Sequence, residues 1–235
     1  MDFLHVRLQA PERLLSTLAD FYTSRLGVEL LERTDELVAV NIGVTRLDFV
    51  QSAAQAFYHF ALLAPGNRFD ALLTWTAERA ELLPEREKGE VVFDFSNWDA
   101  LACYFHDPAG NIVELIAHRG IGETHAAGSF AGKELLGLSE LGVVGEPAAM
   151  ARLLRDRLEL ELWDGTVHGE NRLGFLGERA KTLILCPPDR PWLPTDRPAE
   201  GHAVDVVLSG PPEGEALIGE FGHRIRRGSA PSLPR

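Results

Sequence analysis

Apolar and polar positions follow the same order twice in the first half of the chain. Two strand-like apolar runs, HVRLQAP (5–11) and HFALLAP (59–65), each place a histidine six positions before a proline. A segment with apolar residues at helical spacing follows each run, over residues 12–27 and 67–83. Further strand-like runs come after each of these segments. The pattern therefore predicts two consecutive β-α-β-β-β units.

The second half repeats the unit less completely. Residues 138–187 have the pattern of a third copy, and DVVLSGP (205–211) resembles the first strand of a fourth copy whose remainder is missing or eroded. The Pro-rich stretch 187–201 is predicted to be a long loop, and the tail 224–235 is predicted to be disordered.

These patterns divide the chain into three parts. Residues 1–118 hold the first two units, which we expect to pair with each other around a metal site. A Gly- and Ala-rich linker is predicted over residues 119–134, and residues 135–235 hold the third unit and the degenerate fourth. The expected fold class is α+β, built from tandem βαβββ modules with mixed sheets.

Composition and charge exclude several partners. An apolar fraction of 45% and a charged fraction of 25% are those of an average soluble globular protein. A net charge of −12 argues against a nucleic-acid or anionic-membrane surface, which would repel the chain. The apolar runs are too short to span a membrane, and the first residues do not have the layout of a signal peptide. With two cysteines and no CxxC spacing, we expect a reducing, cytoplasmic location.

A carboxylate in the last strand-like run of the second unit needs a partner. In NIVELIA (111–117), Glu114 lies between two isoleucines on one face of the predicted strand. An isolated buried carboxylate is costly, so Glu114 requires a cation, a hydrogen-bond donor or water. Asp48, in TRLDFVQ (45–51), occupies the equivalent position of the first unit.

The first strands of the two units carry candidate partners for these acids. His5 and His59 are equivalent in the repeat, and strand parity places them on the same side as the acidic residues. If the first two units pair into a curved sheet, His5, His59, Asp48 and Glu114 converge. Imidazoles and carboxylates that meet in a cleft form a good site for a divalent metal ion.

Three nearby residues have alternative interpretations. Arg46 is the same-face neighbour of Asp48 and Arg7 is expected close by, so Asp48 could instead form an ordinary ion pair. Arg7 could also hold an anionic group of a substrate. Tyr104 could donate to a bound substrate in a catalytic role, or only line the pocket.

Equivalent positions in the second half hold other residues. Glu140 or Leu141, depending on a one-residue shift, falls at the histidine position of the third unit, and Ile184 replaces its carboxylate. Asp205 takes the histidine position of the partial fourth unit. We therefore expect the second half to keep the architecture and to lack the metal.

This arrangement resembles the vicinal oxygen chelate superfamily, which includes lactoylglutathione lyases, fosfomycin-resistance transferases, extradiol dioxygenases and bleomycin-resistance proteins. The matching features are FYTSRLGVEL (21–30), the repeated strand histidines and YFHDPAGNIVEL (104–115). The resemblance implies paired βαβββ modules that form a cupped sheet around a divalent metal ion such as Fe, Mn, Zn, Ni or Co. It also implies a set of metal ligands, namely His5, His59 and Glu114, with Asp48 as a fourth in the lyase branch.

The resemblance further implies that the metal chelates two adjacent oxygens of a small-molecule substrate. Our first hypothesis is a lyase or isomerase of the glyoxalase type, in which Glu114 or Asp48 acts as the base. The second is an extradiol ring-cleaving dioxygenase that uses Fe(II), although the sequence offers no further pocket histidine as its acid–base group. The third is a metal-free protein that binds and sequesters a drug or metabolite. A homodimer is the expected assembly.

Overall fold

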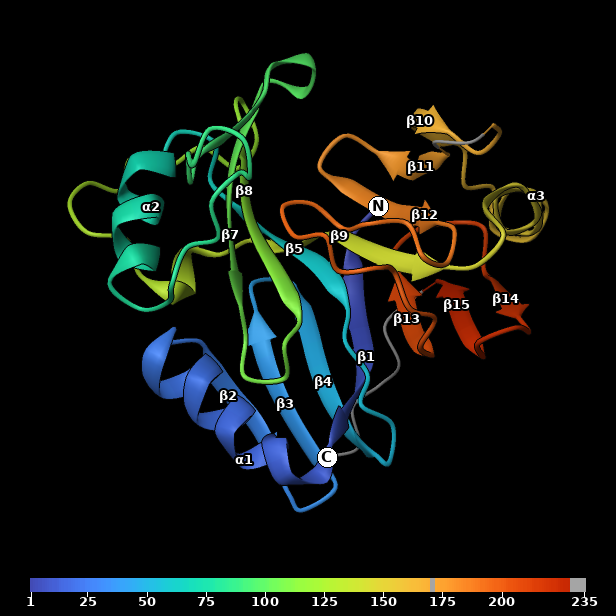
Figure 1. Cartoon of the computed structure of the whole chain (residues 1–235), viewed down its shortest axis with the longest axis horizontal. Helices are drawn as coiled ribbons and strands as arrows, with labels where there is room; N and C mark the ends of the chain where they lie inside the picture. Colours follow the sequence, from blue (N-terminus) through green and yellow to red (C-terminus); the bar gives the residue numbers. More distant parts are fainter. Residues whose placement is uncertain (170–171, 229–235) are drawn as a thin grey trace.

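The structure is a computed structural model that describes residues 1–169 and 172–228, and its elements form four consecutive units (Figure 1). The first unit comprises β1 (Phe3–Pro11), α1 (Glu12–Asp20), β2 (Glu29–Arg33), β3 (Leu37–Ile42) and β4 (Thr45–Ser52). The second comprises β5 (His59–Ala64), α2 (Phe69–Ala77), β6 (Phe93–Phe95), β7 (Ala100–His106) and β8 (Ile112–His118). The third comprises β9 (Gly137–Val144), α3 (Pro147–Leu158), β10 (Leu162–Thr166), β11 (Leu173–Glu178) and β12 (Lys181–Cys186). The fourth consists of β13 (Val204–Leu208), β14 (Gly214–Ile218) and β15 (His223–Arg227).

The strands form two mixed sheets. Sheet A has the order β14-β15-β13-β1-β4-β3-β2, and sheet B has the order β10-β11-β12-β9-β5-β8-β7-β6. The predicted α+β class with curled mixed sheets is confirmed.

The predicted pairing of the first two units is wrong, because sheet A joins the first unit to the fourth and sheet B joins the second to the third. The two junctions are antiparallel contacts of first strands, β1 with β13 and β5 with β9. Equivalent units have equivalent open strand edges, and any of these edges can pair. The overlay of repeats therefore identifies the units but does not select between their possible partners.

One hydrophobic core joins the sheets and helices. Leu15 of α1 packs in this core with alternate residues of the strands, such as Val6 and Leu8 in β1 and Phe60 and Leu62 in β5. Full burial of each leucine contributes about 1.5–3 kcal/mol. Helix α3 contacts both β12 of sheet B and β14 of sheet A, and so spans the two sheets (Figure 1).

Both sheets turn one face to this common core, so their other faces point away from it. We call these other faces inner face A and inner face B. Inner face A carries His5, Arg7, Arg46, Asp48 and Asp205. Inner face B carries His59, Ala61, Tyr104, Glu114 and Glu140.

Aromatic contacts draw the two ends of sheet B together. The ring of Trp98, which follows β6, lies 4.7 Å from the ring of Phe175 in β11 and 5.1 Å from that of Trp163 in β10. Its indole N–H also donates a hydrogen bond to Asp164. Inner face B is thereby enclosed and holds a second buried apolar cluster.

Two segments differ from the sequence predictions. Helix α2 ends at Ala77, short of the predicted limit at residue 83, because the amide of Leu83 donates to the Tyr104 carbonyl and extends β7 pairing. Residues 224–227, expected to be disordered, pair with β13 and β14, while residues 229–235 lie outside the described part. None of the described helices is both long and apolar enough to cross a membrane.

Candidate metal centre

Two glutamates and the alanine between them form a row across inner face B. The strand register places Glu114 of β8 opposite Ala61 of β5, and Ala61 opposite Glu140 of β9. Neighbouring strands lie about 4.8 Å apart, so the two glutamates flank a strand that presents only a methyl group between them. Their side chains can therefore converge above Ala61.

His59 completes the cluster from the same strand as Ala61. Its Nδ1 lies 3.1 Å from the carbonyl oxygen of Ile112, which can only accept, so Nδ1 carries the proton in the neutral ring. The Nε2 lone pair is then free, and this atom lies 3.6 Å from Oε2 of Glu114. Burial lowers the pKa of His59 to about 4, which keeps the imidazole neutral at physiological pH. A neutral imidazole whose second nitrogen is fixed by a carbonyl is the usual form of a histidine ligand.

The two carboxylates are buried without a protein cation. Glu114 and Glu140 are 2% and 3% exposed, and among the described residues neither forms a salt bridge with lysine or arginine. Burial raises the pKa of Glu140 to about 8. Burial, together with the negative charge of Glu140, also raises the pKa of Glu114 well above its usual value. Both acids therefore lack the positive charge that would stabilise their ionised forms.

This donor set fits a metal ion. His59, Glu114 and Glu140 each offer one ligand atom, and the three atoms lie within 4.8 Å of one another. A divalent cation would supply the missing positive charge, and imidazole nitrogen with carboxylate oxygen is a common ligand combination. The buried group could thus hold a metal ion. Ile184, at the fourth repeat-equivalent position on β12, offers no ligand atom.

Two hydroxyl groups flank the cluster. Tyr104 is paired with Glu114 across β7 and β8, is 2% exposed, and hydrogen-bonds to its carboxylate, which partly offsets the rise in the Glu114 pKa. Thr182 is paired with Glu140 on the other side, and its buried Oγ1 has no partner among the described residues. Both hydroxyls are available to the cluster or to a ligand beside it.

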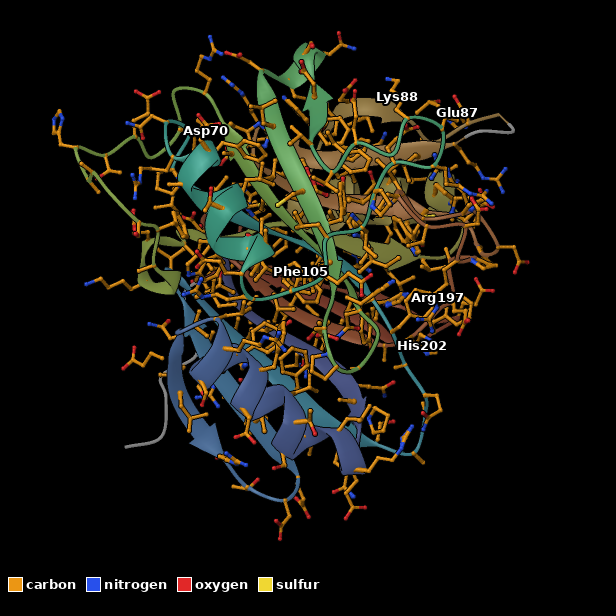
Figure 2. The ribbon with its side chains drawn as sticks, turned by 60° about the vertical axis from the view of Figure 1, so that its left-hand side comes forward. Asp70, Glu87, Lys88, Phe105, Arg197 and His202 are labelled. Atoms are coloured by element: carbon orange, nitrogen blue, oxygen red, sulfur yellow. The ribbon has the colours of Figure 1, made fainter. Side chains whose placement is uncertain are left out.

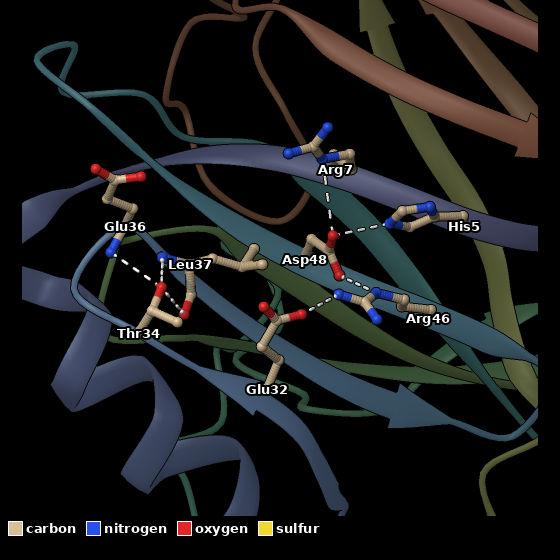
Figure 3. A network of polar contacts seen from close by, with 8 residues as sticks. All are labelled: His5, Arg7, Glu32, Thr34, Glu36, Leu37, Arg46 and Asp48. Carbon is tan, nitrogen blue, oxygen red and sulfur yellow. Dashed lines mark hydrogen bonds and ion pairs between the residues drawn. The ribbon is translucent and has the colours of Figure 1, made fainter. Parts of the chain in front are cut away.

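The first-unit residues predicted as metal ligands lie elsewhere. Figure 3 shows His5 and Asp48 on inner face A, together with Arg7 and Arg46. Nε2 of His5 donates to Oδ2 of Asp48 at 2.8 Å, and Nε of Arg46 donates to Oδ1 at 2.7 Å. Arg7 approaches Oδ2 at 3.7 Å. Burial alone would raise the pKa of Asp48, but the hydrogen bonds from His5 and Arg46 outweigh it and lower this pKa.

The four predicted ligands therefore separate into two pairs. His59 and Glu114 meet on inner face B, whereas His5 and Asp48 meet on inner face A, because the units pair differently from the prediction. The ion-pair interpretation of Asp48 is the one that the structure supports. Arg7, predicted to hold a substrate, belongs to the Asp48 group and not to the His59 cluster.

Glu140 is the ligand candidate that the sequence interpretation missed. It comes from the third unit, which was expected to lack a metal site. The repeat overlay does place Glu140 at the histidine position of that unit, and a carboxylate there was the available signal. A second buried histidine of the same unit is not part of the cluster: His118, at the end of β8, is fully buried, and burial lowers its pKa to about 4. It lies four residues beyond Glu114, about 13 Å along the strand, and is too distant to join the cluster.

Comparison with known proteins agrees with the fold. No family model matches the sequence, and no curated protein does. A putative dioxygenase from Bacillus subtilis subsp. subtilis str. 168 matches with a TM-score of 0.58 and 14% identity, over 97% of this chain and 85% of that one. Glyoxalase I from Zea mays matches with a TM-score of 0.53 and 12% identity, over 96% of this chain and 91% of that one. The chain thus has a glyoxalase-like fold, as its sequence resemblance predicted.

Proposed function

We propose that the chain is a metal-dependent enzyme of the glyoxalase type, a lyase or isomerase that acts on a small molecule with two adjacent oxygens. The observation that carries this proposal is the buried cluster of His59, Glu114 and Glu140, whose ligand atoms lie within 4.8 Å of one another. Two carboxylates balance the charge of a divalent ion, and three protein ligands leave coordination positions for two substrate oxygens.

The residues of the cluster have separate roles in this proposal. A bound metal supplies Lewis-acid stabilisation of negative charge on the substrate oxygens. His59 keeps its Nε2 directed at the site through the bond from Nδ1 to the Ile112 carbonyl. Glu114 is the proposed base, because its carboxylate lies in the cluster where the substrate oxygens would bind and has no lysine or arginine partner among the described residues. Tyr104, hydrogen-bonded to Glu114, orients that carboxylate.

The donor set favours this reaction class over ring cleavage. Iron(II) oxygenases typically use two imidazoles and one carboxylate, whereas the present cluster has one imidazole and two carboxylates. A second carboxylate suits a site that holds a redox-inert divalent ion and transfers a proton.

Metal analysis of protein purified without chelators tests the proposal. We expect one divalent ion per chain in the wild type and loss of that ion in His59→Ala. His5→Ala is the matched control, because His5 occupies the equivalent repeat position but lies on inner face A, and it should keep the ion. A metal-free, folded wild type would instead support the sequestering protein.

Turnover assays then separate the two enzyme classes. Metal-dependent conversion of a dicarbonyl adduct supports the lyase or isomerase. Bound iron with oxygen uptake on catechols would contradict it and support the ring-cleaving dioxygenase.

A further inference from the structure

The Pro-rich loop between β12 and β13 crosses inner face B and inserts one indole beside the cluster. Trp192 is 5% exposed, and its ring lies 4.9 Å from the His59 ring. It belongs to the same buried apolar cluster as Ala61, Ile112 and Ile184. Trp192 therefore covers the candidate metal centre.

A glycine on β9 makes room for this indole. Gly142 lies two residues beyond Glu140 on the same face, and a Cβ added there would come within 2.8 Å of the Trp192 ring. Real Cβ atoms do not approach other heavy atoms so closely, so the ring rests directly on the backbone of the strand that carries Glu140.

The opposite side of Trp192 borders an outer cavity. This cavity has a volume of about 590 Å³ and is bounded by two segments, residues 85–87 and residues 190–196. Figure 2 shows Glu87, in the first segment, and the adjoining Lys88 on the same side of the molecule as Arg197, which adjoins the second segment. Trp192 is thus the partition between the cavity and the cluster.

The loop has few ties to the rest of the molecule. Its backbone bonds are largely internal, with Trp192 donating to the Arg197 carbonyl and Ala199 to that of Arg190. Outside the loop, Arg197 stacks 3.3 Å from the Phe57 ring centroid and donates to the Gly110 carbonyl. An exposed ion pair between Arg86 and Asp196 bridges the cavity. A segment with mainly internal bonds can move away as a unit at modest cost.

We propose that Trp192 controls access to the metal centre, and that the outer cavity is the entrance through which the substrate arrives. The proposal rests on the proposed function. The indole must withdraw before substrate oxygens can reach His59, Glu114 and Glu140 from this side. The space that the indole vacates is flat and apolar. Trp192 therefore also selects the substrate, which should carry a flat, apolar group next to its two oxygens.

The test measures how fast a small chelator reaches the metal. Protein loaded with Co²⁺ is mixed with acetohydroxamate, which offers two adjacent oxygens, and the visible absorption of the cobalt is followed by stopped flow. If the open form of wild type is populated to about 1–10%, Trp192→Ala should raise the association rate about tenfold or more. Trp192→Phe should fall between the two. Trp163→Ala, at the opposite rim of sheet B, should leave the rate unchanged.

A second variant checks that the indole acts through its position. Gly142→Ala should displace the ring and accelerate association in wild type, but it should add little to Trp192→Ala, because the residue that it displaces is already gone. Circular dichroism confirms the fold of each variant.

The possible failures are distinguishable. If Co²⁺ does not bind, the metal-dependent function and the access proposal both fail. If Co²⁺ binds with equal affinity but Trp192→Ala associates at the wild-type rate, the access proposal alone is overturned. Acceleration in Trp163→Ala would overturn it too, since it would locate the entrance at the other rim.

Discussion

Inner faces A and B are built from the same repeated unit, and both carry a histidine and a carboxylate at equivalent positions. On inner face A, Asp48 is satisfied by the chain itself, through Arg46 and His5. On inner face B, Glu114 and Glu140 share one neutral imidazole and have no protein cation among the described residues. The pKa of Asp48 is lowered accordingly, whereas those of the two glutamates are raised.

Enclosure amplifies this difference. Inner face A is open enough for the Arg7 side chain to be 43% exposed, while Trp98 and Trp192 close inner face B. Water cannot stabilise an ion in an enclosed apolar site, so the cluster must take up protons or a cation. Within this fold, the same acidic position is therefore structural where the sequence supplies an arginine and a candidate ligand site where it does not.

Metal addition should give the largest effect, and on inner face B alone. In chelator-treated protein, a divalent ion at 1,000 times its Kd should raise the free energy of unfolding by about 4 kcal/mol. For a chain of this size that corresponds to a rise of about 10 °C in Tm. Thermal unfolding with and without metal measures it. Glu140→Gln should abolish the rise and Asp48→Asn should retain it; the reverse result would assign the metal to inner face A.

Replacing one acid by its amide on each face should have unequal consequences. Asp48→Asn leaves Arg46 and His5 without their anion and should lower the free energy of unfolding by about 3 kcal/mol. In metal-free protein at pH 7, Glu140→Gln removes a carboxyl that must take up a proton on folding, so it should raise the free energy of unfolding by up to about 3 kcal/mol. Urea unfolding compares the two, and a larger loss in Glu140→Gln would show that inner face B supplies its own counter-charge.

The pH dependence of metal-free protein should come from inner face B. Because the folded pKa of Glu140 is raised to about 8, the native state holds a proton that the unfolded chain releases near pH 4.5. The contribution of Glu140 to the free energy of unfolding is therefore fully present below pH 4.5 and is lost as the pH rises through 8. The pKa of His59 is lowered to about 4, so it acts in the opposite direction, but only below pH 6.5.

Between pH 6.5 and 8 we therefore expect Glu140 alone to cost wild type without metal about 2 kcal/mol, and Glu114, whose pKa is raised as well, to add to this loss. Unfolding by urea at both pH values provides the measurement. The loss should be smaller in Glu140→Gln, where burial still raises the pKa of Glu114, and an equal loss in that variant would contradict the assignment to Glu140.

Much of the fold could be predicted from the sequence, because the signals involved are local. The strand and helix periods of the first three units are visible in apolar spacing, and the repeat is visible in His5 and His59. The pairing of units could not be predicted, since it is decided by contacts between distant edges, β1 with β13 and β5 with β9.

The candidate site was half predictable for the same reason. His59 and Glu114 belong to one unit, and strand parity alone places them on one face. Glu140 joins them only because β9 pairs with β5, and Trp192 covers them only because a loop with no regular pattern returns across that face. A ligand supplied by another unit has no local signature in the sequence. The sequence analysis therefore predicted His5 as the further ligand, where the structure has Glu140.

The smallest expected effect concerns Arg7, whose predicted role was to hold a substrate. Its ion pair with Asp48 is long, at 3.7 Å, and partly exposed, so Arg7→Gln should lower the free energy of unfolding by about 0.5 kcal/mol. Arg46→Gln, which breaks a 2.7 Å bond to the same carboxylate, should cost about 2 kcal/mol. Because Arg7 lies on inner face A, its loss should leave metal content and hydroxamate association unchanged. A slower association in Arg7→Gln would mean that the ligand contacts both faces, and the separation of a structural face from a binding face would then fail.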